Sequence, residues 1–271
     1  YNTATGAQSL ASNVDGSHNS AHGVRALTGN AHGGHNTAVG YEALGHLSLS
    51  GDYNTAVGSE ALTSNQVNAN TATGYQALNS NTFGERNTAN GFKSLHDNIG
   101  VAGSVEGHDN TASGYNSLMK NTTGYSNTAF GSEALINNNT GHVNTAFGYQ
   151  ALYTNETGQE NVAVGPGALS NNLAGSENVA TGMNALLHNT ANWNTAMGHA
   201  ALQMNTTGSA NAALGIGALD FNISGSNNTA SGANALFLNS TGNNNASFGY
   251  YSMLYNNGDC NTAVGANSFG T

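Results

Sequence analysis

Small and apolar residues recur along this chain at a spacing of about 17 positions. The unit reads N-T-A-x-G-x-x-[AS]-L-x-x-N-x-x-G-x-x, and residues 144–160 are a representative copy. Ala stands at position 3, Ala or Ser at position 8, and Leu at position 9 in nearly every copy. Two small side chains and one large one per unit indicate a narrow interior to which every copy contributes alike.

The Asn that opens each unit marks 16 tandem copies. These Asn residues are 16 to 18 positions apart, except between Asn87 and Asn110, where the spacing is 23. We therefore expect a single repeat domain over 1–271, with an irregular insertion at 98–109 that leaves the regular path as a loop. The opening residues are Asn2, Asn19, Asn36, Asn54, Asn70, Asn87, Asn110, Asn127, Asn144, Asn161, Asn178, Asn194, Asn211, Asn228, Asn245 and Asn261.

The length of the unit favours strands over helices, because helical repeats need about 34 residues for a packed pair. The segment T-A-x-G alternates in the manner of a strand, and its Gly suits a turn. The half-unit x-x-A-L-x-x-N could be extended or form a helical turn, and we expect it to be extended. Each coil would hold two short strands and two turns. Stacked coils would form an all-β, parallel β-solenoid or β-roll of about 16 coils of about 17 residues.

Stacking places like residues of successive coils above one another at the strand spacing of about 4.8 Å. Asn over Asn would let each side-chain amide donate to the next, so that buried amides find partners. We therefore expect a structural role for the opening Asn and for the Leu at position 9. Representative members of these ladders are Asn36, Asn54, Asn127, Asn144, Leu135 and Leu152.

Position 4 predicts a second apolar surface, on the strand face opposite the Ala of position 3. Burying one Leu per coil contributes about 1.5 to 3 kcal/mol. Ordering the backbone costs about 1 to 2 kcal/mol for every residue. Subunit association at this second face would compensate, and threefold symmetry is the simplest closed arrangement for a rod, so we expect a homotrimer. The apolar residues at position 4 are Val39, Val57, Phe130, Phe147, Val164, Met197, Leu214, Phe248 and Val264.

Charge narrows the classes of partner. Charged residues make up 7% of the 271 residues, against about 25% in ordinary globular proteins. Four bases oppose 14 acids, and no Lys or Arg follows Lys120. Clustered cations are therefore lacking, so we expect no nucleic-acid partner. No apolar run approaches the roughly 20 residues of a membrane span, so we expect no membrane insertion of this segment. Cys260 is the single cysteine, and since the chain begins at Tyr1 rather than Met we expect it to be a piece of a longer protein.

The N-[TS]-A-x-G element resembles the N-S-x-A-x-G signature of trimeric autotransporter adhesin heads. The longer unit N-T-A-V-G-Y-x-A-L-x-x-N-T-x-G is similar to the repeats of phage tail fibres and bacterial trimeric surface fibres. The resemblance spans the whole chain, although the adhesin heads have shorter coils. It implies three β-rolls side by side in an extracellular fibre on a cell surface or virion, with a receptor-binding or spacer role. It transfers no catalytic residue and no cofactor.

Aromatic residues at position 6 are the candidates for ligand binding. Rings beside Asn and Thr ladders form the type of surface on which sugars stack and hydrogen-bond. The same rings could instead pack between chains or over neighbouring turns. The candidates are Tyr41, Tyr75, Phe92, Tyr115, Tyr149 and Tyr250.

Two further groups of residues suggest chemistry that has a simpler explanation. His18 and His35 lie one coil apart and could contribute to a metal site, but no H-x-H or H-E-x-x-H spacing occurs, and exposed stacked residues explain them. Glu156 and Glu160 could act as a carboxylate pair on a polysaccharide, but a solvated acidic strip explains them. We expect no metal, no cofactor and no enzymatic activity.

The sequence thus predicts a structural and adhesive fibre segment that mediates surface attachment or binds a cell-surface glycan or protein receptor. The main alternative is a passive spacer of a trimeric fibre. An ice-binding fibre would need an unbroken Thr column at position 2, which is interrupted in the second half of the chain. A polysaccharide-hydrolysing fibre is the remaining alternative. The residues that interrupt the Thr column in the second half are Val162, Val179, Ala212 and Ala246.

Overall fold

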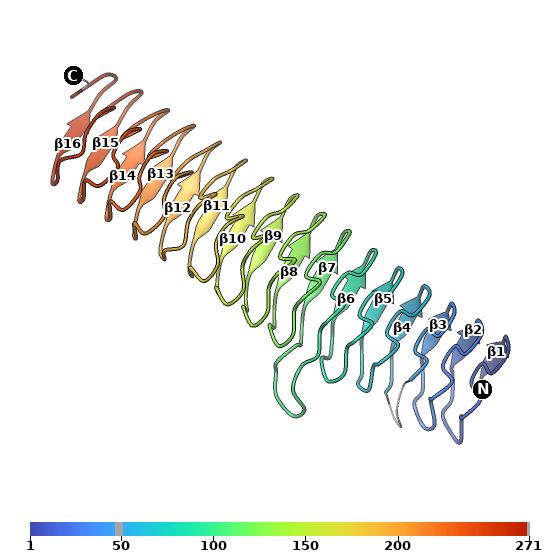
Figure 1. Cartoon of the computed structure of the whole chain (residues 1–271). Helices are drawn as coiled ribbons and strands as arrows, with labels where there is room; N and C mark the ends of the chain where they lie inside the picture. Colours follow the sequence, from blue (N-terminus) through green and yellow to red (C-terminus); the bar gives the residue numbers. More distant parts are fainter. Residues whose placement is uncertain (47–50, 270–271) are drawn as a thin grey trace. The chain divides into compact units, whose positions relative to one another are not determined.

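The computed structural model describes residues 1–46 and 51–269, so the last two residues of the predicted repeat domain lie outside it. In this part of the chain the regular elements are 16 strands of three residues, one per coil, without a helix (Figure 1). The chain divides into two compact units, a first unit of Tyr1–His142 and a second unit of Val143–Thr271. The prediction of an all-β, parallel solenoid is confirmed.

Eight strands lie in each unit and follow one another in chain order. The strands of the first unit are β1 (Thr3–Thr5), β2 (Ser20–His22), β3 (Thr37–Val39), β4 (Thr55–Val57), β5 (Thr71–Thr73), β6 (Thr88–Asn90), β7 (Thr111–Ser113) and β8 (Thr128–Phe130). Those of the second unit are β9 (Thr145–Phe147), β10 (Val162–Val164), β11 (Val179–Thr181), β12 (Thr195–Met197), β13 (Ala212–Leu214), β14 (Thr229–Ser231), β15 (Ala246–Phe248) and β16 (Thr262–Val264).

Strand pairing within each unit is parallel and keeps the repeat in register. Ala38 pairs with Ala56, and Ala56 pairs with Ala72, so position 3 stacks on position 3. The same register holds in the second unit, where Ala163 pairs with Ala180. Insertions and deletions between the strands therefore do not shift the core column.

The interior is as narrow as the repeat pattern indicates. In the second to fourteenth coils the side chains at positions 3, 8 and 9 are buried, as Ala38, Ala43 and Leu44 show in the third coil. In the first coil Ala4 is exposed and Leu10 is half-buried. Leu135 and Leu152 are also fully buried. A column of one Leu and two Ala per coil leaves no room for a larger core, so the turns must be stabilised by hydrogen bonds.

The half-unit after the strand is a pair of tight turns, and the prediction that it is extended is wrong. In every coil the residues at positions 7 and 9 have positive φ, as at Glu42 (52°) and Leu44 (51°). A strand or a right-handed helix needs negative φ. The backbone N–H of Leu44 donates to the carbonyl of Ala61 in the next coil (3.0 Å), and that of Glu42 donates to Val24 in the previous one (3.0 Å). These contacts between coils compensate the roughly 1 to 2 kcal/mol that a left-handed residue costs.

Glycine at position 5 closes the strand because no other residue fits. Gly91 has φ of 134°, and a Cβ built on it would lie 2.5 Å from the carbonyl oxygen of Gly114 in the next coil. Side chains are thus excluded both by the dihedral angle and by the close approach of the neighbouring backbone.

The insertion leaves the coil without disturbing the stack (Figure 1). Asn98 Nδ2 donates to the carbonyl of Gly107 (2.8 Å), as Asn121 Nδ2 does to that of Gly124 in a regular coil (2.7 Å). Gly107 therefore occupies repeat position 15, and the extra residues bulge out before it.

Candidate ligand-binding sites

Two buried Asn ladders hold the coils in place and thereby position every surface side chain. At position 1, the backbone N–H of Asn54 donates to Asn36 Oδ1 (2.8 Å), and Asn36 Nδ2 donates to the carbonyl of Gly51 (2.7 Å). The expected amide-to-amide contact occurs as an additional bond in some coils, as from Asn161 Nδ2 to Asn144 Oδ1 (3.1 Å). Each Asn thus ties its own turn to the next coil.

The second ladder, at position 12, was not predicted, although the repeat unit carries Asn there in every complete coil except the third, where residues 37–53 contain no Asn. Asn81 Nδ2 donates to Asn65 Oδ1 (2.7 Å), and Asn98 Nδ2 donates to Asn81 Oδ1 (2.7 Å). Asn121 continues the ladder to Asn98 (2.8 Å), and all these side chains are fully buried. The ladder therefore runs through the coil that carries the insertion.

Three of the six predicted aromatic residues come together as an aromatic column, formed by Tyr75, Phe92 and Tyr115. The ring centroids of Tyr75 and Phe92 are 5.3 Å apart with planes inclined by 24°, and those of Phe92 and Tyr115 are 5.4 Å apart at 13°. The three side chains are between 41% and 51% exposed. Lys93 Nζ lies 5.7 Å from the Phe92 centroid.

The other three aromatic candidates do not join this column. Ser59 separates Tyr41 from Tyr75 at position 6, and the hydrogen bond of Tyr41 to the Glu42 carboxylate raises the pKa of the Tyr41 hydroxyl. Tyr149 and Tyr250 belong to the second unit. They are exposed in coils whose position 6 neighbours are aliphatic or small.

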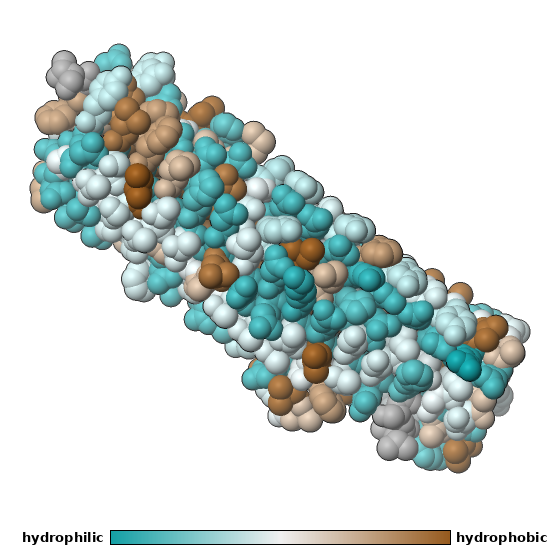
Figure 2. All heavy atoms as spheres, viewed as in Figure 1, coloured by the Kyte–Doolittle hydropathy of each residue, from teal (hydrophilic) through white to brown (hydrophobic). Residues whose placement is uncertain are grey.

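The strand face differs in polarity between the two units. Beside the aromatic column, position 4 holds the polar residues Thr73, Asn90 and Ser113. In the second unit position 4 is mostly apolar and exposed by 37% to 74%. Apolar patches are visible over the C-terminal coils in Figure 2. The apolar residues at position 4 of the second unit are Phe147, Val164, Met197, Leu214, Phe248 and Val264.

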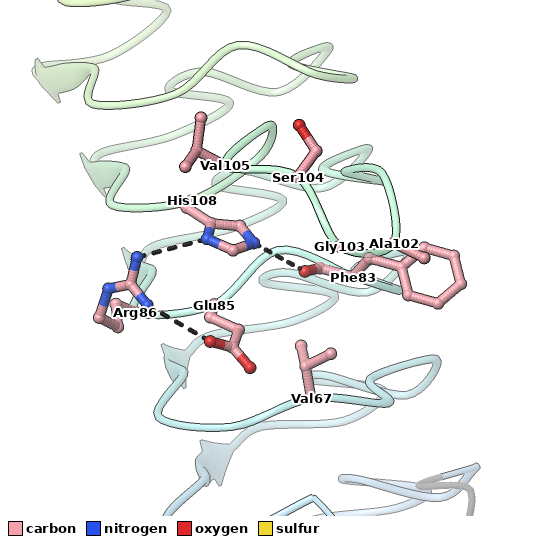
Figure 3. Close-up of a pocket in the computed structure, with 9 residues that line it drawn as sticks. All are labelled: Val67, Phe83, Glu85, Arg86, Ala102, Gly103, Ser104, Val105 and His108. Atoms are coloured by element: carbon pink, nitrogen blue, oxygen red, sulfur yellow. Dashed lines mark hydrogen bonds and ion pairs between the residues drawn. The ribbon is translucent and has the colours of Figure 1, made fainter.

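The insertion builds a hollow of about 500 Å³ on the surface of the first unit (Figure 3). Val67 and Phe83 come from the preceding coils, and Ala102–Val105 come from the insertion. Glu85, Arg86 and His108 also line the hollow. We call this site the insertion hollow. The sequence indicated the loop but not the hollow, because its lining comes from three different coils.

Ion pairs fix the base of the loop. Arg86 makes a bidentate contact with Asp109, with Nε to Oδ1 at 2.7 Å and Nη2 to Oδ2 at 2.9 Å. This hydrogen bonding holds the pKa of Asp109 below its ordinary value and raises the pKa of Arg86. Arg86 Nη1 also approaches Glu85 Oε2 at 3.3 Å. One guanidinium thus joins two carboxylates.

His108 links the same cluster to the aromatic wall (Figure 3). Its Nδ1 lies 3.3 Å from Arg86 Nη2, and its Nε2 lies 3.1 Å from the carbonyl oxygen of Phe83. A guanidinium only donates and a carbonyl only accepts, so these contacts require the neutral tautomer with its proton on Nε2.

His18 and His35 stack as exposed rings. Their centroids are 4.8 Å apart with planes inclined by 5°, and Tyr53 continues the stack at 5.0 Å from His35. The lone pairs of an imidazole lie in the ring plane, so parallel rings do not direct them at one point. Within residues 1–46 and 51–269, no group of three or more His, Cys, Asp or Glu side chains is placed to hold a metal ion.

Glu156 and Glu160 are both exposed and lie on either side of the buried Gly158 turn. Over the described residues, no helix is long and apolar enough to cross a membrane.

Comparison of the sequence with models of known protein families and with curated proteins found no match. The geometry of the chain itself therefore carries the functional argument.

Proposed function

We propose that this chain is a structural and adhesive segment of an extracellular fibre, on a cell surface or a virion, that attaches to its target by binding glycans. The observation that carries the proposal is the exposed aromatic column of Tyr75, Phe92 and Tyr115. Sugar rings present apolar C–H faces that pack on aromatic rings, and hydroxyl groups that both donate and accept hydrogen bonds. The column offers rings on which the C–H faces can pack, and position 4 of the same coils offers hydroxyl and amide groups that can hydrogen-bond to the sugar hydroxyls.

The rings of the aromatic column are not needed to build the coil. Ser59 and Ser132 occupy position 6 in the coils on either side of the column, and both coils have the same strand and turn structure. Exposed aromatic rings that the fold does not require favour a role in binding over a role in stability.

Three copies would associate through the apolar strand face of the second unit. Residues 143–271 contain five acids and no Lys or Arg, and none of the acids stands at position 2, 4 or 6 of the repeat. Like charges are therefore kept away from this face, which favours contact with identical copies. Threefold closure is the simplest symmetry for parallel rods. No catalytic role and no cofactor are proposed.

A passive spacer is the second candidate, favoured by the two Asn ladders that repeat the same contacts in coil after coil. A spacer needs only regular stacking, so its surface rings would be dispensable. The two candidates differ in what removal of the rings does.

A glycan array separates them. The variant Tyr75→Ser, Phe92→Ser, Tyr115→Ser introduces the residue that position 6 holds in neighbouring coils, and Tyr41→Ser is the matched control. Stacking on an exposed ring contributes about 0.5 to 1.5 kcal/mol, so the triple variant should bind at least about tenfold more weakly while the control binds as the parent does. Equal binding by the triple variant, or no glycan bound by the parent, would favour the spacer.

A further inference from the structure

We propose that the insertion hollow is a second binding site, independent of the aromatic column, that takes one uncharged polyhydroxylated ring such as a neutral sugar residue. Its walls are apolar at Val67 and Phe83, and its polar groups come from Glu85, Arg86 and Ser104.

Ile99 and Gly100 belong to the stack, since both of their N–H groups donate to the carbonyl of Thr122 in the next coil (3.0 and 2.8 Å), whereas the hydrogen bonds of residues 101–106 stay within the loop. Asn98 donates to Asn81 on one side and accepts from Asn121 on the other, as position 12 does in regular coils. Gly107 supplies the carbonyl that Asn87 Nδ2 and Asn98 Nδ2 both use. Because the coil is complete without the extra residues, their folded shape calls for another explanation.

The loop is held in one shape before any ligand arrives. The N–H of Ser104 donates to the carbonyl of Val101, and that of His108 to the carbonyl of Val105, both at 3.1 Å. The N–H of Gly107 donates to the carbonyl of Thr123 in the next coil at 3.0 Å. A wall that is already ordered loses little conformational entropy on binding, which favours affinity.

The size of the hollow suits a small ring. Its volume of about 500 Å³ lies within the roughly 300 to 1,000 Å³ that small-molecule sites occupy. Phe83 and Val105 are 36% and 60% exposed, so apolar surface is available on two sides. The C–H face of a sugar ring can cover such surface.

The polar groups of the hollow retain capacity to bind hydroxyl groups. Glu85 accepts from Asn68 Nδ2 at 3.4 Å and from Arg86 Nη1 at 3.3 Å, both long contacts that leave lone pairs of the carboxylate available. Ser104 Oγ accepts from the N–H of Glu106 at 3.3 Å, so its own proton can be donated. A carboxylate acceptor beside hydroxyl and guanidinium donors matches neighbouring hydroxyl groups, since each of these both donates and accepts.

The charge of the site selects against ions. Asp109 already neutralises Arg86 through two short hydrogen bonds, and Glu85 adds a further negative charge. An anionic ligand would meet this excess of negative charge, in a chain whose net charge is −10. A cationic ligand would gain from Glu85 but would also lie against the guanidinium of Arg86, which lines the same hollow. An uncharged ligand avoids the repulsion that either ion meets.

Two variants test the site. In the first, residues 99–106 are replaced by Thr-Thr, which recreates the Asn-Thr-Thr-Gly turn of residues 121–124 and removes one wall while keeping both Asn ladders. In the second, Glu85→Gln keeps the size of the side chain and removes its charge. Every protein in this test also carries Tyr75→Ser, Phe92→Ser and Tyr115→Ser, which removes the proposed glycan column, and Glu177→Gln, at an exposed site, is the matched control. Circular dichroism and the unfolding midpoint of each protein establish that the solenoid is intact.

The probes are free galactose, glucose, mannose and N-acetylglucosamine, with N-acetylneuraminate as the anionic and cadaverine as the cationic comparison, titrated by saturation-transfer NMR. In the triple Ser background we expect at least one neutral sugar to bind, about tenfold weaker binding after Glu85→Gln, and no binding to the shortened loop. Glu177→Gln should bind as the triple Ser protein does. Because the column is absent from all of these proteins, the result is independent of the proposed glycan column. Absence of neutral-sugar binding at tens of millimolar, unchanged binding to the shortened loop, or preference for either charged probe would overturn the proposal.

Discussion

Asn172 Nδ2 donates to Asn155 Oδ1 in the preceding coil at 3.1 Å, and both side chains are fully buried. The same amide nitrogen donates to the carbonyl of Gly175 at 2.8 Å. Asn171, the preceding residue in the chain, is exposed. The adjacent residues Asn171 and Asn172 are thus exposed and buried, respectively. Substituting each in turn measures how much the position 12 ladder contributes to the free energy of unfolding.

Asn172→Ala should lower the free energy of unfolding by about 2 to 4 kcal/mol, because three buried hydrogen bonds are lost and a cavity remains. Asn171→Ala is the matched control and should change it by less than about 0.5 kcal/mol. Urea titration followed by circular dichroism measures both. Equal effects of the two substitutions would contradict a structural role for the ladder.

Gly91→Ala should destabilise the first unit strongly, since its Cβ would lie 2.5 Å from the carbonyl oxygen of Gly114. We expect a loss above about 2 kcal/mol, because backbone of the next coil must move. Gly103→Ala, in the insertion, is the control: φ is 75° there, but no atom lies within 4 Å of the added Cβ. Its loss should stay near the roughly 1 kcal/mol of a left-handed alanine. Thermal unfolding of the two variants side by side tests this difference.

Asp220 should make the second unit more stable at mildly acidic pH. Its Oδ1 is buried without a hydrogen-bond partner, and burial raises the pKa of its carboxyl to about 6, partly offset by His199. The folded state therefore holds the proton more tightly than the unfolded state, so stability increases as pH falls from above 6 towards the ordinary carboxyl pKa of about 3.9. Because the group is partly exposed, we expect a gain on the order of 1 kcal/mol.

Asp220→Asn should remove this pH dependence and raise stability at pH 7 by a similar amount. Denaturant titrations at pH 7.5 and pH 4.5 provide the measurement. The stability difference between the parent and Asp220→Asn should be smaller at pH 4.5 than at pH 7.5. An equal difference at the two pH values would contradict a raised pKa of Asp220 in the folded state.

Light scattering should give a solution mass three times that of one chain if the apolar face of the second unit joins three copies. Met197 and Leu214 are register partners on β12 and β13 and are 46% and 54% exposed. The double variant Met197→Gln, Leu214→Gln should shift the mass towards that of a single chain, because apolar contact area is lost. Ser113→Gln, at the same repeat position in the first unit, should leave the mass unchanged. A monomeric parent would exclude the trimer.

The left-handed residues of each coil could not be read from the sequence. Local propensity places Leu44 in a strand or a helix, and Glu42 favours a helix. Their positive φ values become favourable only when coils above and below supply hydrogen-bond partners, such as the carbonyl of Ala61. That is an effect of stacking, which no single unit contains.

The period, the parallel register and the composition of the core follow from the sequence alone, because identical spacing brings like residues above one another in any stacked arrangement. The sequence also placed aromatic residues in one column, of which Tyr75, Phe92 and Tyr115 form an unbroken stack. Only the tertiary structure decided the left-handed turns and the insertion hollow. The turns depend on hydrogen bonds between coils, and the hollow depends on residues from three coils that meet only when the chain is wound.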